Sequence, residues 1–132
     1  MSEALERLAT IAVDCGFKLH DALGPRLLES VYEACLARSL VDRGLVVERQ
    51  KTIPIKYGGV VLDEAFRADL LVENHLLIEV KSTDGFAAVP GKQVLTSLRL
   101  MNLPLGLLMN FGSSSYRDGV RRIANNYYPP VP

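Results

Sequence analysis

The sequence predicts an α/β fold in which helices flank a mixed sheet of three antiparallel strands and one parallel strand. Apolar residues recur at helical spacing over roughly the first 43 residues. Short β-branched runs bounded by turn residues follow between residues 45 and 80. A helical segment at 91–101 then leads to a continuous apolar run at 105–111. This strand–helix–strand order favours a parallel pair between the last two strands.

Length and composition indicate one globular domain over residues 1–132, with a short proline-rich tail at 126–132. No window is apolar for long enough to span a membrane, and the acidic start MSEALERLA is unlike a signal peptide. Cys15 and Cys35 lack metal-site spacing, so we expect reduced thiols in a cytoplasmic protein with no membrane partner. The formal net charge of zero argues against nucleic-acid binding by the whole surface, but leaves room for a local basic face.

Two helices are expected first, at 3–23 and from about 26 to 43. The first would bury one face, made of Leu5, Leu8, Ile11, Ala12, Cys15 and Leu19. Gly24 suits its end, and Pro25 suits the start of the next helix. The second would bury Leu28, Val31, Cys35 and Leu36, with Glu29, Tyr32 and Glu33 along a neighbouring face. His20 is expected to be structural.

The remaining elements follow from turn residues and apolar runs. An extended segment at 45–57 turns at Gly58-Gly59 and continues from residue 60, and Pro54 places the first strand at an edge or kinks it. After a loop at 82–90 and the helix at 91–101, the run at 105–111 is a buried strand. A last helix is expected at 116–125, carrying Arg117, Arg121 and Arg122 on a face that is solvated or meets phosphate.

A hairpin is expected in the stretch RADLLVENHLLIEVKS. Two apolar strands, 68–72 and 76–80, flank a three-residue turn at 73–75. Because side chains two residues apart share a face of a strand, this register sets Asp69 directly opposite Glu79.

Two carboxylates inside apolar strands are in electrostatic conflict. Opposed like charges destabilise a sheet, and burial raises the pKa of one carboxyl unless a cation lies between them. A divalent metal removes the conflict, and an all-oxygen ligand set suits Mg²⁺ or Mn²⁺. Lys81, on the same face as Glu79, would reach a metal-bound water or an anionic phosphate. A surface hairpin with solvated charges is the alternative interpretation.

Four blocks of the sequence carry a family resemblance: GPRLLESVYEACL, RADLLVENHLLIEVKS, KQVLTSLRLMNLPLGLLMNFG and DGVRRIAN. In order and spacing they resemble the GxxExxY proteins of the PD-(D/E)xK nuclease-like superfamily, over about residues 20–125. The resemblance implies a restriction-endonuclease-like α/β fold, whose core is helix, three antiparallel strands, helix and strand.

The resemblance also implies site residues. The implied metal ligands are Asp69, Glu79 and the Val80 carbonyl, and the implied catalytic residues are Lys81, Glu29 and Gln93. Glu29 would act through a metal-bound water with Tyr32 as its aromatic partner, and Gln93 would position water or phosphate. Arg26 replaces the glycine that names the motif and would lie one helical turn from Glu29, where it pairs with that carboxylate or reaches a phosphate. Ser97 replaces a tyrosine often found after the glutamine.

The expected function is therefore Mg²⁺- or Mn²⁺-dependent phosphodiester hydrolysis, with DNA as the substrate. No segment predicts a sequence-reading module, so specificity would come from loops, a homodimer or a partner protein. Two alternatives stay open. One is a nucleic-acid or protein-binding module with weak or no hydrolysis, and the other is a hydrolase of a different phosphate ester.

Overall fold

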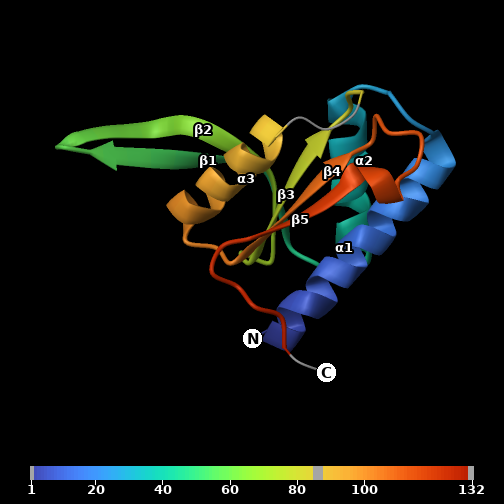
Figure 1. Ribbon diagram of the computed structural model, residues 1–132, viewed down its shortest axis with the longest axis horizontal. Helices are drawn as coiled ribbons and strands as arrows, with labels where there is room; N and C mark the ends of the chain where they lie inside the picture. The colour runs from blue at the N-terminus through green and yellow to red at the C-terminus, as the bar shows by residue number, and fades with distance from the viewer. Residues whose placement is uncertain (1, 85–87, 131–132) are drawn as a thin grey trace.

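The computed structural model describes residues 2–84 and 88–130, which form a five-stranded mixed sheet flanked by helices (Figure 1). The helices are α1 (Ser2–Leu23), α2 (Glu29–Asp42) and α3 (Ala88–Met101). The strands are β1 (Val47–Tyr57), β2 (Val60–Val72), β3 (Leu76–Lys81), β4 (Leu105–Asn110) and β5 (Val120–Ala124), with a short 3-10 helix, η1 (Arg117–Gly119), before β5. They lie in the order β1-β2-β3-β4-β5, and only the β3–β4 pair is parallel among these neighbours.

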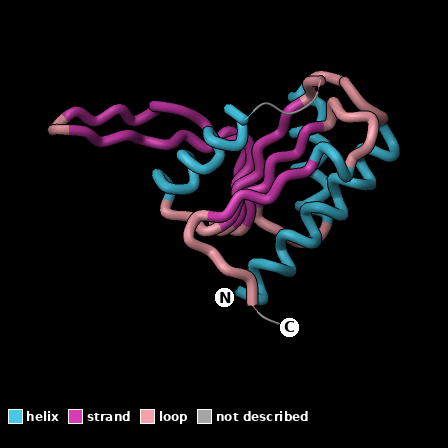
Figure 2. The backbone as a smooth tube through the Cα atoms, viewed as in Figure 1, coloured by secondary structure: helices cyan, strands magenta, loops and turns pink. Residues whose placement is uncertain are grey.

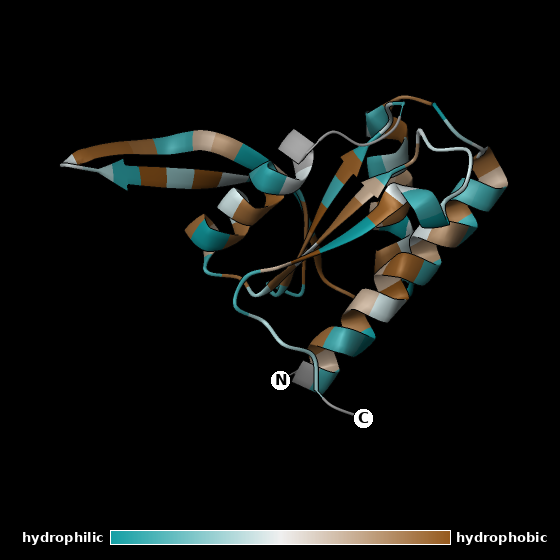
Figure 3. Cartoon of the chain, in the orientation of Figure 1, coloured by the Kyte–Doolittle hydropathy of each residue, from teal (hydrophilic) through white to brown (hydrophobic). Residues whose placement is uncertain are grey.

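The sheet separates two apolar layers. The larger layer lies between the sheet and the helices α1 and α2, and it contains Leu8, Leu36, Leu40, Ile78 and Met109. The smaller layer lies under α3 and contains Ile53, Ala68, Leu77, Val94, Leu98 and Leu108. In Figure 3 the central strands are coloured mainly hydrophobic, as expected for strands covered on both faces. The predicted parallel pairing of the strand ending at Lys81 with the strand at 105–110 is confirmed.

The turn between β2 and β3 has the register that the sequence predicts. Val72 pairs with Leu76, and the N–H of His75 donates to the Val72 carbonyl at 3.0 Å. Glu73 and Asn74 both have positive φ, 53° and 56°, a conformation that asparagine tolerates better than most residues. This tight turn fixes which side chains of the two strands share a face.

A β-hairpin arm, made of the outer halves of β1 and β2, extends beyond the body of the protein (Figure 2). Its tip is Gly58-Gly59, with φ of 52° and 85°, as a two-residue hairpin turn requires. At its base the register shifts: Ile53 pairs with Phe66, whereas Ile55 pairs with Leu62. One residue of β1, Pro54, therefore lies opposite three residues of β2. Proline has no backbone N–H to donate to the ladder, so its place at this irregularity leaves no ladder hydrogen bond unmade.

The second helix differs from its prediction in start and in buried face. It begins at Glu29, not near residue 26, because Arg26 has a φ of 67° and Leu28 is extended. Its buried residues are Tyr32, Glu33, Leu36, Ala37 and Leu40, whereas Leu28 is 74% exposed. The Tyr32 ring stacks on Phe111 with centroids 4.4 Å apart, and this aromatic pair takes the interior place that the aliphatic stripe was expected to fill.

The predicted helix at 116–125 is wrong, because this segment forms η1 and the strand β5. β5 pairs antiparallel with β4, so the buried strand β4 has ladder partners on both sides. Gly119 lies against the Asn110 carbonyl, where a Cβ would meet the oxygen at 2.1 Å, so a larger residue would push β5 away. The sheet consequently has five strands where four were expected.

The other boundaries agree closely with the predictions. α1 has the expected extent, and α3 begins at Ala88, three residues before the predicted start. Residues 85–87 of the expected loop, and 131–132 of the tail, lie outside the described residues. The tail is anchored at Tyr127, whose hydroxyl donates to Glu6 at 2.5 Å. None of the described helices is both long and apolar enough to cross a membrane.

Candidate active site

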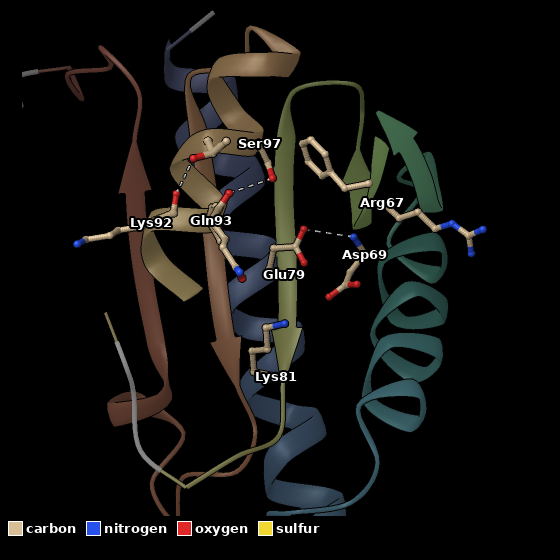
Figure 4. Close-up of a pocket in the computed structure, with 10 residues that line it drawn as sticks. Arg67, Asp69, Glu79, Lys81, Lys92, Gln93 and Ser97 are labelled. Carbon is tan, nitrogen blue, oxygen red and sulfur yellow. Dashed lines mark hydrogen bonds between the residues drawn. The ribbon is translucent and has the colours of Figure 1, made fainter. Parts of the chain in front are cut away.

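Two carboxylates converge where β2 and β3 part. The ladder between these strands ends at the pair Leu70 and Ile78, and the next residues toward the open end are Asp69 and Glu79. The Val80 N–H donates to Oδ2 of Asp69 at 2.8 Å, and the Asp69 N–H makes a long contact of 3.4 Å to Oε1 of Glu79 (Figure 4). Both side chains lie on one face of the sheet, as the turn register predicts, and α3 covers this face.

The charge on Glu79 is strongly affected by this arrangement. Burial and, next, the negative charge of Asp69 together raise the pKa of Glu79 to about 8, while the Lys81 ammonium acts in the opposite direction. Without a cation the pair therefore holds a proton at neutral pH. A metal ion between two such carboxylates replaces that proton and removes the repulsion.

Lys81 follows Glu79 on the same face of β3 (Figure 4). Its side chain is half-buried, and within the described part of the chain its ammonium makes no ion pair within 4.0 Å. Both features suit a cation that meets a substrate anion, because its charge is not already neutralised by a structural partner.

A pocket of about 520 Å³ lies between this sheet face and α3. The strands contribute Asp69, Glu79 and Lys81, and α3 contributes Gln93 and Ser97. The Gln93 side chain extends from α3 toward β3 (Figure 4), whereas the Ser97 hydroxyl donates to the Gln93 backbone carbonyl at 3.0 Å. The structure thus brings Gln93 together with the carboxylates and Lys81, while Ser97 is engaged with its own helix.

The two motif residues of α2 lie elsewhere. Glu29 is exposed at the first position of the helix. Tyr32 is fully buried, and its hydroxyl donates to the Gly24 carbonyl at 2.5 Å and accepts from the Leu27 N–H at 3.1 Å. Neither belongs to the described residues that line the pocket. Tyr32 therefore holds the connection between α1 and α2, which is a structural role.

Arg26 does not lie one helical turn before Glu29, because it precedes the helix and has positive φ. Its guanidinium pairs with Asp84 at 2.5 Å and donates to the Gly112 carbonyl at 3.2 Å. Arg26 thus ties the segment after β3 to the segment after β4, beside the end of the Lys81 strand. The expectation of a helical Arg26–Glu29 neighbour pair is wrong for this reason.

Sequence reasoning missed two residues that contact the site, Gln50 on β1 and Glu33 on α2. The Gln50 amide donates to Oδ1 of Asp69 at 3.3 Å and to Oε1 of Glu33 at 2.6 Å. The signal for Glu33 is its helical position beside Tyr32, whereas the aliphatic residues of the same helix predict a different buried face. No local signal marks Gln50, because its place opposite Asp69 depends on the irregular register of the arm.

The donor set is compatible with a hard divalent cation. Among residues 2–84 and 88–130, no group of three or more histidine, cysteine, aspartate or glutamate side chains could hold a metal. A cation at this place would therefore be held by Asp69 and Glu79 together with main-chain and water oxygens, as Mg²⁺ commonly is. The pKa of Glu79 is raised by burial and by the negative charge of Asp69, and a cation bound between the two carboxylates would counteract both effects. The raised pKa therefore supports the fit.

Comparison with known families gives one match. The model of the PD-(D/E)XK nuclease superfamily matches residues 6–123, which include every strand of the sheet except the last residue of β5. No curated protein and no solved structure matches the chain.

Proposed function

Because the chain belongs to the PD-(D/E)XK nuclease superfamily, we propose that it is a metal-dependent nuclease that hydrolyses phosphodiester bonds of DNA. The observation that carries the proposal is the convergence of Asp69 and Glu79 in a pocket that Lys81 also lines. The resemblance of four sequence blocks to the GxxExxY proteins, one group within this superfamily, supports the same function. The superfamily generally uses divalent metal ions, and we propose Mg²⁺ or Mn²⁺ here.

The proposed ligands are Asp69, Glu79 and the Val80 carbonyl. The ion, when bound, polarises a phosphoryl oxygen and lowers the pKa of its bound water. Lys81 stabilises the negative charge that develops on the phosphate in the transition state, and its charge is available because it has no structural ion pair in the described chain. From the opposite wall of the pocket, the Gln93 amide donates a hydrogen bond to phosphate, or donates to or accepts from water.

Further features support a polyanionic substrate. Arg67 and Lys92 line the pocket and add positive charge on its two sides, although the whole chain has a formal net charge of zero. Glu29, exposed at the start of α2, can act on this site only through solvent or substrate. We propose that recognition of a particular DNA requires a loop, a second copy of the chain or a partner protein.

The neutral net charge weighs against strong binding of DNA by the whole surface and so leaves one alternative to test, a nucleic-acid or protein-binding module on the same fold with weak or no hydrolysis. The two functions differ in turnover and not in binding, so an assay must measure both. Binding is followed by fluorescence anisotropy of a labelled duplex, and cleavage is followed separately.

The test is nicking of supercoiled plasmid with Mg²⁺ or Mn²⁺. Lys81→Ala is expected to lower the rate by about 100-fold or more while leaving metal binding in place. Lys18→Ala is the matched control, because Lys18 is an exposed α1 lysine paired with Asp14 on the opposite side of the sheet. Cleavage that persists in EDTA, or that survives Lys81→Ala, contradicts the proposal. Duplex binding without turnover supports the binding module instead.

A further inference from the structure

Gln50 has an unusual backbone for a residue inside a strand. Its φ is 51°, in the left-handed region that residues other than glycine rarely adopt. The ladder pairs Arg49 with Leu70 and Lys51 with Ala68, so Gln50 lies directly across from Asp69. Such conformations persist where the surrounding structure requires them, and they gather at functional sites.

The side chain of Gln50 bridges two carboxylates. Its Nε2 lies 2.6 Å from Oε1 of Glu33 and 3.3 Å from Oδ1 of Asp69. Ionised carboxylates only accept hydrogen bonds, so the amide nitrogen, and not the amide oxygen, must occupy the position between them. One donor group thus links α2 to the candidate metal ligand on β2.

Glu33 is a firm anchor for this link. It is only 6% exposed, and its second oxygen accepts two hydrogen bonds from the Arg49 guanidinium, at 3.1 and 3.3 Å. Both of its oxygens therefore have partners, which a buried carboxylate requires. A buried, ion-paired group changes its orientation less readily than an exposed one, so it can hold Gln50 in place.

We propose that Gln50 is a positioning residue for the metal site, held by Glu33 and acting on Asp69. Gln50 fixes Oδ1 of Asp69 and the Val80 N–H fixes Oδ2, so the carboxylate plane is set before a cation arrives. Each oxygen keeps a lone pair for the cation. This proposal rests on the proposed function. The sequence predicts that a glutamate of the second helix, Glu29, supports the metal site; in our proposal the supporting glutamate is Glu33, which acts through Gln50.

The main test is Mn²⁺ affinity of the purified full chain, measured by isothermal titration calorimetry. Loss of a partner that orients a metal ligand typically weakens metal binding by 10- to 100-fold, so Gln50→Gly is expected to weaken it by about 10-fold or more. Glycine suits a φ of 51°, which offsets part of the cost of leaving Oε1 of Glu33 without its donor, so the variant is expected to remain folded at the temperature of the titration. The matched control is Lys51→Ala, which removes the exposed neighbour that pairs with Glu48. Unchanged affinity in Gln50→Gly, or an equal loss in the control, overturns the proposal.

A double-mutant cycle tests the route through Glu33. Glu33→Gln keeps the volume of the side chain but weakens its acceptor, so it is expected to lower Mn²⁺ affinity by several-fold. Because both changes act through one contact, the double variant is expected to bind as weakly as Gln50→Gly alone, within about two-fold. Additive losses would mean that Glu33 and Gln50 affect the metal independently.

A readout without metal separates this inference from the proposed function. The Val80 amide donates to Asp69, so its hydrogen exchange reports how well the carboxylate is held. In Gln50→Gly we expect exchange at Val80 to become at least about 10-fold faster, with Ile78 unchanged in the intact ladder. If wild type binds no Mn²⁺, the proposed function fails. Unchanged exchange at Val80 overturns the role of Gln50 whether or not metal binds.

Discussion

The Val80 backbone N–H donates a 2.8 Å hydrogen bond to Oδ2 of Asp69, across the gap where β2 and β3 part. The ladder of these strands ends one residue earlier, at Leu70 and Ile78. Beyond that pair, side-chain carboxylates take the backbone N–H groups, because the Asp69 N–H likewise points to Glu79 at 3.4 Å. The proposed metal ligands thus replace the backbone ladder between the two strands at this point, so the candidate site lies where the sheet opens.

The pKa of Glu79 predicts a stability that falls with pH. This pKa is about 8 in the folded protein and 4.5 ordinarily, so between these values only the folded chain keeps the proton. The contribution of Glu79 to the free energy of unfolding is therefore fully present below about pH 4.5 and is lost as the pH rises through about 8, by at most about 1.4 kcal/mol per pH unit. Urea unfolding in EDTA at several pH values measures the slope.

Glu79→Gln should remove most of that slope, since glutamine does not titrate. The control is Glu64→Gln, which changes an exposed glutamate of β2 and should leave the slope in place. Equal slopes for wild type and Glu79→Gln between pH 5 and pH 8 in EDTA would mean that Glu79 is ionised at neutral pH, against this expectation.

Asp69→Asn should abolish cleavage and, in EDTA, stabilise the protein at pH values where Glu79 is ionised. At about pH 9 the substitution removes repulsion from Glu79, whereas at about pH 5 Glu79 is protonated and no such gain remains. Thermal unfolding at the two pH values measures the difference. Asp63→Asn, at an exposed position of the same strand, is the control. A loss of stability at both pH values would give Asp69 a structural role through its bonds to Val80 and Gln50.

Tyr32→Phe should destabilise the fold without affecting the site. The change keeps the stacking on Phe111 but removes the hydroxyl that bonds Gly24 and Leu27, at a cost of about 1–2 kcal/mol. Chemical denaturation measures the loss, and Tyr57→Phe, on an 83% exposed side chain, is the control. If the folded variant lost metal binding or turnover, Tyr32 would belong to the active site after all.

Arg26→Gly and Arg26→Ala should differ in stability. A φ of 67° suits glycine and strains alanine, while the ion pair to Asp84 is exposed on both sides and contributes little. The glycine variant is therefore expected to be more stable than the alanine variant by about 1 kcal/mol in urea unfolding. The salt dependence of DNA binding is a separate readout, because loss of one phosphate contact lowers its slope by about 0.9. An unchanged slope in both variants excludes a phosphate contact at Arg26.

Local patterns in the sequence determined the elements that carry the candidate metal ligands. The turn at 73–75 allows one register, and the observed pairs Val72–Leu76, Leu71–Leu77 and Leu70–Ile78 follow from it. The apolar run at 105–111 is most simply interpreted as a buried strand, and all residues of β4 (Leu105–Asn110) are indeed buried. These features depend on residues close in sequence, so the period of the side chains and the length of one turn suffice to predict them.

Tertiary structure decided what packs against that core. The Gly58-Gly59 turn alone pairs Tyr57 with Val60, and the same register continued would set Gln50 opposite Arg67. The irregularity at Pro54 shifts the register by two residues and sets Gln50 opposite Asp69 instead. The length of such an irregularity depends on how the two strands meet the body of the protein, which no local pattern encodes.

The C-terminal segment and α2 show the same limit. Residues 120–124 form a strand because β4 offers an open edge that only the folded sheet provides, and the close passage of Gly119 past Asn110 allows it. α2 turns Tyr32 and Glu33 inward because Phe111, far along the chain, offers a ring to stack on and Arg49 and Gln50 offer donors to a buried carboxylate. The sequence by itself thus determined the hairpin of carboxylates, and the tertiary structure decided its neighbours, since contacts between distant segments depend on the packing of the whole chain.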